Sequence, residues 1–149
     1  AAPDSTHFTP GGICTRAQAV TFLWRAAGSP APKSTAMPLP TWPQAATTSR
    51  PSCGLWRTAS PSTSDTTFSP NATCSRAQIV TFLWRSQKSP AAGSVNPFTD
   101  VSADAYYADA VLWAVKESVT SGTTATTFSP NTNCTRAQIV TFIYRAMAE

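Results

Sequence analysis

The hydrophobic positions of the chain recur in three near-identical segments, at residues 7–25, 67–85 and 127–145. In each segment a Phe-Ser/Thr-Pro or closely similar turn leads to a cysteine, and a stretch rich in Ala, Val and aromatic residues follows. In the third copy apolar residues occupy most of the circumference of a helix, which predicts a helix from Arg136 to about Met147 that is buried nearly all round. We expect the same helix in every copy, with a common core that includes Phe22, Phe82, Phe142, Trp24, Trp84 and Tyr144.

The start of each of these helices is marked by the same pair of residues. A Ser or Thr is followed three positions later by Gln, which is the pattern of a capping box. The pairs are Thr15–Gln18, Ser75–Gln78 and Thr135–Gln138. The sequence therefore predicts three capped helices.

A second apolar pattern precedes the third copy. Apolar residues stand at i, i+3, i+4, i+7 and i+8 from Tyr107. This spacing predicts an amphipathic helix from Tyr106 to about Glu117, with Asp104 as its N-cap. A complete repeat is then a helix, a loop and a capped helix. Because repeats of this size cannot bury their apolar faces alone, we expect an all-α fold of three tandem helix-loop-helix units around one core.

The middle repeat departs from this pattern over residues 39–62, which contain Pro43, Pro51 and Pro61 and no helical period. Proline disfavours a helix interior, so we expect this part to be irregular. Codons permitted for the segment, read in a second frame, encode Thr-Asp-Val-Ala-Ala-Gly-Gly-Tyr-Tyr and then Val-Glu-Ala-Val-Leu-Trp-Ala-Val-Glu-Asn-Gly-Ile-Thr, which parallels residues 99–120. We interpret 39–62 as a compensated frameshift, in the gene or in its sequencing.

Composition argues against two kinds of partner. Only 12% of the residues are charged, and the 11 Lys and Arg are scattered singly along the chain. A protein that follows phosphates needs a clustered basic patch, so we expect no nucleic-acid partner. No run of about 18 or more apolar residues occurs, which predicts that the chain has no membrane span.

The cysteines indicate neither a disulfide framework nor a metal site. Cys14, Cys74 and Cys134 occupy one position of the three repeats, and Cys53 stands outside the pattern. Equivalent positions cannot all pair with each other, and the spacing matches no compact zinc motif. We expect small buried side chains at these positions, no metal and no cofactor. With one His and seven scattered acidic residues, the chain is not expected to be an enzyme.

The third repeat carries an ordered set of short motifs. They are Phe98-Thr99-Asp100-Val101, a Tyr-Tyr pair, Ala110-Val111-Leu112-Trp113-Ala114, Val119-Thr120-Ser121-Gly122, Phe128-Ser129-Pro130 and Cys134-Thr135-Arg136-Ala137-Gln138. In this order they resemble the FxDV, WA, GI-x-G, F-x-P and ITRAE elements of the S-layer homology domain, and the resemblance covers all but the irregular segment. In every copy Gln replaces the Glu of the last element, and Cys replaces its Ile.

The resemblance implies a triplet of such units in a pseudo-threefold helical body around the three capped helices, with ligand grooves between units. Residues 1–28 would be the C-terminal half of unit 1, which lacks its opening helix. Residues 38–88 would be unit 2, irregular over 39–62, and residues 97–149 a complete unit 3.

The function that the resemblance implies is non-catalytic anchoring. Triplets of this family hold bacterial surface proteins and exoenzymes on cell-wall polysaccharide, often a pyruvylated one. The partner would be a secondary polysaccharide linked to peptidoglycan, the location the extracellular bacterial surface or S-layer, and the chain part of a larger secreted protein. Two other functions stay open: a structural, self-assembling surface-layer protein, and a targeting appendage of a secreted glycan-active enzyme.

Arg16, Arg76 and Arg136 each directly follow a helix cap. A cation at this position is unfavourable by about a few tenths of a kcal/mol, because the helix start carries partial positive charge. A cation beside free helix N–H groups suits an anion, so we expect these arginines to bind a sugar carboxylate. Alternatively, each pairs with an aspartate such as Asp100 and pins adjacent units, or persists only through duplication.

By the same resemblance, Asp100, Trp113 and Gly122 would line the groove. Asp100 would accept hydroxyl protons or orient the arginine, Trp113 would offer an apolar face to a sugar, and Gly122 would allow close backbone approach. Burial statistics favour a core role for Trp113. The arginines near the helix ends are expected to be structural, and they are Arg25, Arg85 and Arg145.

Overall fold

The computed structural model describes residues 8–29 and 69–147, and within them the fold is all-helical. The helices of this part are α1 Arg16–Ala26, α3 Arg76–Ser86, α4 Ala108–Lys116 and α5 Arg136–Met147. Strand pairing in these residues is limited to isolated bridges between the segments that precede α1, α3 and α5. The predicted all-α class is confirmed, and α5 has the predicted bounds. Residues 39–62, with Cys53 and the frameshift interpretation, lie outside the described residues.

The three capped helices begin as predicted. In each, the hydroxyl of the cap residue accepts a hydrogen bond of 3.3 Å from the backbone N–H of the Gln three residues later. The Gln side chain accepts one of 3.0–3.1 Å from the backbone N–H of the cap residue. Each box satisfies two N–H groups that a helix start otherwise leaves unpaired, and such a cap contributes about 1 kcal/mol.

The segments before α1, α3 and α5 join in a closed cycle of backbone hydrogen bonds. The N–H of Cys14 donates to the carbonyl of Cys134, that of Cys74 to Cys14, and that of Cys134 to Cys74, at 2.9–3.0 Å. Each unit therefore donates to one neighbour and accepts from the other. A threefold relation between the three junctions would produce such a cycle, while the pseudo-threefold arrangement of whole units stays a prediction.

A second cycle of backbone hydrogen bonds runs around the three repeats in the opposite direction. In this cycle the N–H groups of the first two residues of each helix donate to carbonyls of the neighbouring repeat to which the cysteine N–H does not donate. The donor–acceptor pairs are Arg16–Ala72, Arg76–Thr132 and Arg136–Gly12, then Ala17–Pro70, Ala77–Pro130 and Ala137–Pro10, all at 2.9–3.0 Å. Each junction is thus hydrogen-bonded to both of the others. The three helix starts are held side by side by these backbone hydrogen bonds.

The thiols of Cys14, Cys74 and Cys134 are fully buried and free. Burial raises the pKa of Cys14 and of Cys134 to about 11, against the lowering effect of nearby arginines, and it raises the pKa of Cys74 further. Such thiols stay protonated and unreactive at neutral pH. The prediction of small buried side chains is therefore confirmed for these three cysteines. In the part of the chain that the structure describes, no three His, Cys, Asp or Glu side chains are grouped to hold a metal ion.

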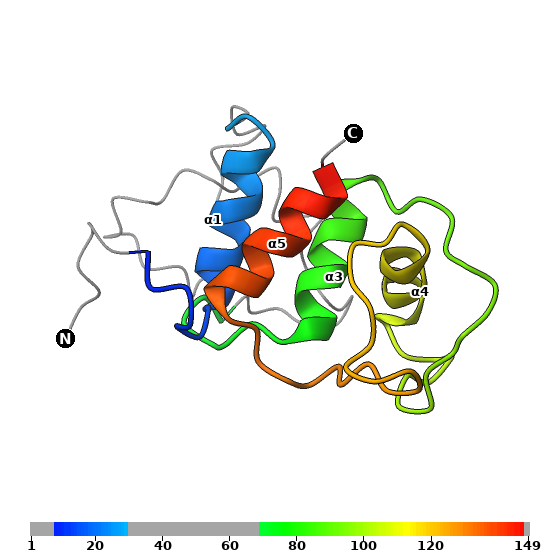
Figure 1. Ribbon diagram of the computed structural model, residues 1–149. Coiled ribbons are helices and arrows are strands. Elements are labelled where there is room, and N and C mark those ends of the chain that lie inside the picture. Colours follow the sequence, from blue (N-terminus) through cyan, green and yellow to red (C-terminus); the bar gives the residue numbers. More distant parts are fainter. Residues whose placement is uncertain (1–7, 30–68, 148–149) are drawn as a thin grey trace.

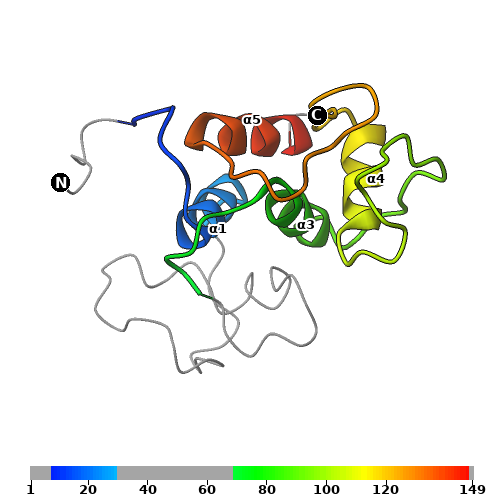
Figure 2. The same cartoon turned by 90° about the horizontal axis from the view of Figure 1, so that it is seen from below.

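Helices α1, α3 and α5 pack against one another, and α4 packs against α3. Figure 2 shows α3 between α1 and α4, with α5 lying across the side that α1 and α3 share. The core they enclose draws side chains from all three repeats. Its largest members include Val20, Leu23, Ile79, Val80, Phe82, Leu83, Val111, Trp113, Phe128, Ile139, Phe142 and Ile143.

The start of α4 differs from the prediction. The helix begins at Ala108 rather than at Tyr106, and its N-cap is Tyr107, which makes no side-chain cap hydrogen bond. The expectation that Asp104 caps this helix is therefore wrong. Residues 102–105 instead form a turn closed by a backbone hydrogen bond of 3.1 Å between its ends. The two tyrosine rings then meet edge to face, with centroids 5.0 Å apart, where the pattern predicted a first helical turn.

Burial nearly all round is confirmed for α3 and wrong for α5. On α5, Ile139, Phe142 and Ile143 are buried, but Val140 is 40% exposed and Tyr144 is 72% exposed. The reason is position in the bundle, because α3 has α1, α4 and α5 as neighbours. Figure 1 shows α5 crossing in front of α1 and α3 with its outer side uncovered by the other described helices.

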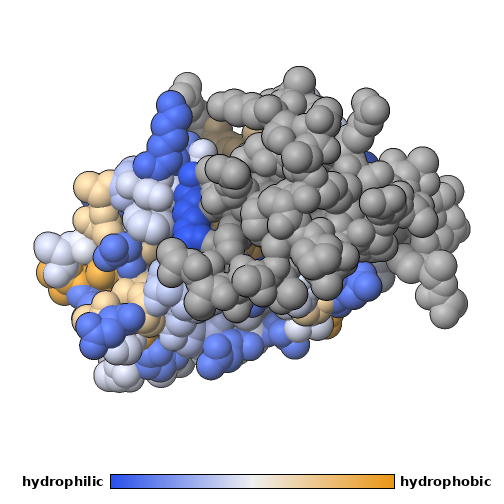
Figure 3. Space-filling model, turned by 180° about the vertical axis from the view of Figure 1, so that it is seen from behind, coloured by the Kyte–Doolittle hydropathy of each residue, from blue (hydrophilic) through white to orange (hydrophobic). Residues whose placement is uncertain are grey.

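None of the described helices combines the length and apolar character needed to cross a bilayer. On the face shown in Figure 3, the described residues expose hydrophilic side chains with smaller hydrophobic areas between them. Most of the apolar residues of the four helices are in the core instead.

Candidate functional site

The three candidate arginines open helices whose first N–H groups already have acceptors. The N–H of each arginine and of the next residue donates to carbonyls of a neighbouring unit. The N–H of the Gln at the third position donates to the cap hydroxyl. The expectation of free N–H groups beside Arg16, Arg76 and Arg136 is therefore wrong, because the neighbouring unit supplies the oxygen atoms that an anion would otherwise supply.

The Arg76 side chain reaches from α3 into the loop of the third repeat. Its Nε donates to the carbonyl of Phe128 at 3.0 Å, and its Nη2 donates to the carbonyl of Ser121 at 2.9 Å. The guanidinium also lies 4.8 Å from the ring centroid of Phe128 and 5.7 Å from that of Phe142. Burial lowers the pKa of Arg76, which is 6% exposed, but a guanidinium keeps its charge in proteins. This cation joins the second and third repeats.

Asp100 holds the same loop from the other side. Its carboxylate accepts hydrogen bonds from the N–H of Phe128 at 2.8 Å and of Ser129 at 2.7 Å. The peptide group between these two residues is thus hydrogen-bonded on both sides. Its N–H donates to Asp100, and its carbonyl accepts from Arg76. Burial alone would raise the pKa of Asp100, but these N–H groups, its own N–H and the charge of Arg76 hold the pKa below its usual range.

Arg136 makes the equivalent contacts with the first repeat. Its Nε donates to the carbonyl of Phe8 at 2.8 Å, and its guanidinium lies 5.1 Å from the ring centroid of Phe8 and 5.2 Å from that of Phe22. Phe8 and Phe128 occupy the same position in their repeats, so α5 is linked to unit 1 as α3 is linked to unit 3. Arg136 is half-buried, whereas Arg16 is 5% exposed.

These contacts outweigh the unfavourable field at the helix start. A cation there costs about 0.3–1 kcal/mol, while each hydrogen bond from a charged donor contributes about 1.5–3 kcal/mol. Arg76 makes two such bonds and stacks on two rings. Arg76 and Arg136 therefore have a structural explanation, in which each joins adjacent repeats through a backbone carbonyl, and at Arg76 an aspartate binds the same peptide group.

Gly122 is required by the packing of its own repeat. A Cβ at this residue would lie 2.5 Å from the carbonyl oxygen of Thr127, 2.6 Å from Cε1 of Phe98, and closer still to the carbonyl oxygen of Thr124. The space beside the Gly122 Cα is thus filled by the chain itself. The residue also lines a cavity of about 460 Å³, together with Phe98, Val115 and the residues of the 121–125 loop.

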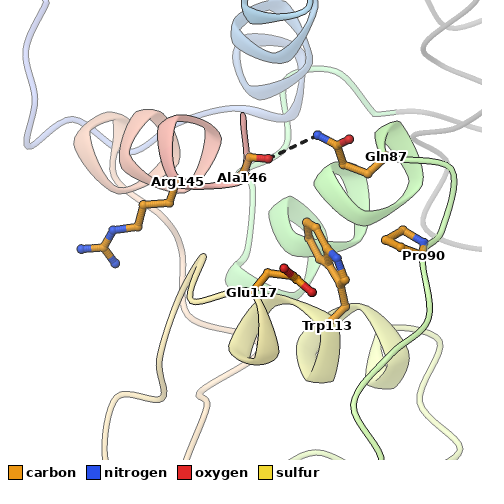
Figure 4. Close-up of a pocket in the computed structure, with 6 residues that line it drawn as sticks. All are labelled: Gln87, Pro90, Trp113, Glu117, Arg145 and Ala146. Atoms are coloured by element: carbon orange, nitrogen blue, oxygen red, sulfur yellow. Dashed lines mark hydrogen bonds between the residues drawn. The ribbon is translucent and has the colours of Figure 1, made fainter. Parts of the chain in front are cut away.

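A second cavity, of about 410 Å³, lies where the ends of α3, α4 and α5 meet. It is lined by Gln87, Pro90, Trp113, Glu117, Arg145 and Ala146 (Figure 4). Trp113 is 4% exposed and belongs to the core, so its indole forms a wall of the cavity while packing inward. The side-chain amide of Gln87 donates to the carbonyl of Ala146 at 3.4 Å and so links the ends of α3 and α5. Figure 4 shows the guanidinium of Arg145 pointing away from the indole.

The structure brings three of the six candidate residues together. Arg76, Asp100 and Gly122 meet around the loop of residues 121–129, whereas Trp113 lines the other cavity. Arg16 and Arg136 open α1 and α5, at the other two junctions.

Sequence reasoning missed Gln87 and Glu117 and gave Arg145 only a role at a helix end. These residues reach the cavity because the C-terminal ends of three helices converge there. Gln87 aligns with Ala27 and Met147 in the other copies, so it is not repeated. Repetition was the signal that drew attention to the arginines, and it carries no information on an unrepeated residue.

Comparison with known proteins identifies the region that contains α4, the loop of residues 121–129 and the start of α5. Residues 97–140 match the sequence profile of the S-layer homology domain family. They form an S-layer homology domain. Over 71 residues the chain is also 41% identical to the surface-layer 125 kDa protein of Lysinibacillus sphaericus. That match covers 48% of this chain and 6% of the relative, so the chain spans a small part of that protein's length.

The S-layer homology domain contains Asp100, Trp113, Gly122 and Arg136 among the candidate residues. Arg76 lies outside it, on the helix that the domain packs against. The contacts of Arg76 with this domain are therefore contacts between consecutive repeats. The assignment of the first two repeats as further units, with the boundaries given above, stays a prediction.

We predict that Asp100 makes the stability of the S-layer homology domain depend on pH in acid. Its folded-state pKa is below the unfolded value of about 3.9. Its contribution is therefore full above that unfolded pKa and is lost as the pH falls through the lower folded-state pKa. Thermal unfolding of Asp100→Asn and wild type, followed by circular dichroism from about pH 7 to about pH 2, should show a difference in Tm that shrinks in acid. Exposed Asp104→Asn is the control, and a difference for Asp100→Asn that is the same at every pH would contradict the prediction.

We also predict that Gly122→Ala lowers the free energy of unfolding by about 1–3 kcal/mol, because the added Cβ overlaps two carbonyl oxygens and a ring carbon. Urea denaturation measures the change. Gly11→Ala is the matched control, since no atom lies within 4 Å of its Cβ, and it should change stability by less than about 0.5 kcal/mol. Equal effects of the two substitutions would argue against a packing requirement at Gly122.

Proposed function

We propose that the chain is a non-catalytic module that anchors a larger secreted protein to the bacterial cell wall. The observation that carries this proposal is the S-layer homology domain at residues 97–140. The likeness of about half of the chain to a surface-layer protein supports it. The proposal places the protein outside the cell, at the wall or in the surface layer.

The ligand that we propose is a secondary cell-wall polysaccharide with an acidic or pyruvylated substituent, bound at the seams between repeats. The cavity at the ends of α3, α4 and α5 supports this choice, because it lies between the second and third repeats. Its lining residues carry an amide, a carboxylate and a guanidinium, and the indole of Trp113 forms one wall. Amide and carboxylate oxygens accept hydrogen bonds from sugar hydroxyls, a guanidinium pairs with carboxylates, and an indole packs on the apolar face of a sugar ring.

The three repeated arginines enter this proposal with unequal access. Arg136 is half-buried, so we propose that its guanidinium meets a sugar carboxylate at the seam between α5 and the first repeat. Arg16 and Arg76 are 5% and 6% exposed, and we assign them to the walls of their seams. Asp100 and Gly122 then act by holding the loop of residues 121–129, which borders the seam between the second and third repeats.

A structural, self-assembling surface-layer protein is the second candidate. The observation in its favour is that the relative is itself a surface-layer protein. In this case contacts between chains, rather than a glycan, would hold the protein in place. A targeting appendage of a glycan-active enzyme is compatible with the same anchoring chemistry, with the reaction carried by another part of the longer protein.

Binding to purified wall sacculi tests the proposal. We expect the chain to sediment with sacculi and to lose most of this binding after chemical removal of the secondary polysaccharide. Binding that persists on stripped sacculi, or sedimentation without sacculi, would instead indicate the self-assembling protein. Release of sugar from the sacculi would indicate an enzyme.

Within this assay we expect Arg136→Ala to weaken binding about tenfold or more, the loss expected for one hydrogen bond to a charged group. Exposed Arg25→Ala, in the last turn of α1, is the matched control and should leave binding unchanged. Helix content and Tm are measured on both variants. A collapse of helix content in Arg136→Ala would show that this arginine supports the scaffold rather than the ligand.

A further inference from the structure

The cavity at the ends of α3, α4 and α5 has a buried hydrogen-bond donor without an acceptor in its wall. Trp113 is 4% exposed, and its indole Nε1 makes no hydrogen bond with residues 8–29 or 69–147. By contrast, the indole Nε1 of Trp84 donates to the carbonyl of Pro90 at 2.8 Å. A buried indole N–H usually has a partner, because leaving it unpaired costs free energy. Since Trp113 lines the cavity, a ligand with an acceptor oxygen would supply that partner.

Two acceptor groups line the same cavity. The side-chain amide of Gln87 donates to the carbonyl of Ala146 at 3.4 Å, while its Oε1 has no donor within the described part of the chain. The carboxylate of Glu117 lies 3.7 Å from the ammonium of Lys116, in a half-exposed pair of the kind that contributes little to stability. Both Gln87 and Glu117 are lining residues (Figure 4). The cavity thus combines one donor with two acceptors.

The charges at this cavity disfavour an acidic group. Arg145 is a lining residue, but its guanidinium points away from the indole and forms no ion pair with Glu117 (Figure 4). A ligand carboxylate that accepts from the indole N–H would be repelled by the carboxylate of Glu117. A ligand ammonium has donors only and would leave the indole N–H unpaired. The three polar groups therefore favour an uncharged ligand.

Among uncharged groups, hydroxyls match the cavity best. A hydroxyl both donates and accepts, so two adjacent hydroxyls can supply one acceptor and two donors at once. An acetamido group has a single N–H and can satisfy only one of the two acceptors. The volume of about 410 Å³ is within the range of small-ligand sites. A sugar ring with neighbouring free hydroxyls therefore suits both the size and the hydrogen bonding.

This set of groups is found in one repeat only. Gln87 stands where the other copies have Ala27 and Met147, neither of which has a polar side chain. The amide acceptor therefore distinguishes the seam between the second and third repeats from the other seams.

We propose that the cavity is a subsite for an uncharged hexose residue with two adjacent free hydroxyls, separate from the place of the sugar carboxylate at Arg136. One hydroxyl oxygen accepts a hydrogen bond from Nε1 of Trp113. The two hydroxyls donate to Oε1 of Gln87 and to the carboxylate of Glu117. This inference rests on the proposed glycan-binding function and adds the chemical class of a second sugar residue.

The test is an NMR titration of the full chain, labelled with ¹⁵N at the tryptophan indoles, with four methyl glycosides. The probes are methyl α-mannopyranoside, methyl α-glucopyranoside, methyl N-acetylglucosaminide and methyl glucuronide, and the Trp113→Phe spectrum assigns the Trp113 signal. This signal should shift to saturation with at least one neutral hexoside. The acetamido and acidic probes should bind about fivefold more weakly or less, the loss expected for one hydrogen bond. A Trp113 signal that responds to no probe, or most strongly to the acidic or acetamido one, overturns the proposal.

Matched variants identify the contacts. Gln87→Ala introduces the residue of the first repeat and should weaken hexoside binding about fivefold. Glu117→Gln keeps an acceptor oxygen, so it should weaken hexoside binding less and should remove the discrimination against the glucuronide. Exposed Arg25→Ala is the control and should leave the titration unchanged.

Helix content and Tm are measured on each variant, and a folded Gln87→Ala that binds the hexoside as wild type does would contradict the assignment. Sacculus binding is measured in parallel, so that the two proposals fail separately. Polysaccharide-dependent sedimentation together with an unmoved Trp113 signal overturns the subsite and leaves the anchoring function intact.

Discussion

The rest of the structure depends on the closed cycle of backbone hydrogen bonds that joins the three cysteine-containing junctions. Buried N–H and carbonyl groups must find partners, and here the N–H groups of each cysteine and of the first two residues of each helix find theirs in the two other junctions. No repeat can complete the start of its capped helix alone, so the described repeats form one cooperative body. The cysteine at each junction is fully buried and small, which lets the three segments approach closely. The same cycle uses the N–H groups of the helix starts, which are therefore committed to the fold rather than to an anion.

Around this cycle, the arginines that open α3 and α5 connect these helices to a loop of a neighbouring repeat. Arg76 and Asp100 bind a single peptide group from opposite sides. Arg136 donates to the carbonyl of Phe8 as Arg76 donates to that of Phe128. The cation tolerates an unfavourable helix field because the hydrogen bonds it makes there are worth more. The cavity at the ends of α3, α4 and α5 is formed by the second and third repeats together, whereas the cavity beside Gly122 lies within the third repeat. A wall-binding function at the seams would then depend on neighbouring repeats being docked correctly.

Much of the local structure could be predicted, because it follows from short-range rules. The capping boxes, the bounds of α5 and the buried cysteines all depend on residues a few positions apart or on repetition. The start of α4 could not be predicted, since the tyrosine pair and the 102–105 turn replace the helical turn that the apolar spacing favours. The candidate site was anticipated in part: Arg76, Asp100 and Gly122 do meet, but Trp113 lines a different cavity, with Gln87, Glu117 and Arg145 beside it. Those residues come together only because the helices pack against one another, and the repeated sequence pattern contains no signal of that packing.

By itself, the sequence determined that the chain is built from helical repeats, where the capped helices begin, and which side chains are apolar enough to form a core. Three almost identical helices then acquired different surroundings, so that Val80 on α3 is fully buried whereas its equivalent Val140 on α5 is exposed. Only the tertiary structure decided this, and it also decided that Arg76 and Arg136 bind backbone carbonyls. The physical reason is that hydrophobic burial and hydrogen bonding depend on the neighbours of a residue in space, and identical segments in a cyclic array need not have identical neighbours.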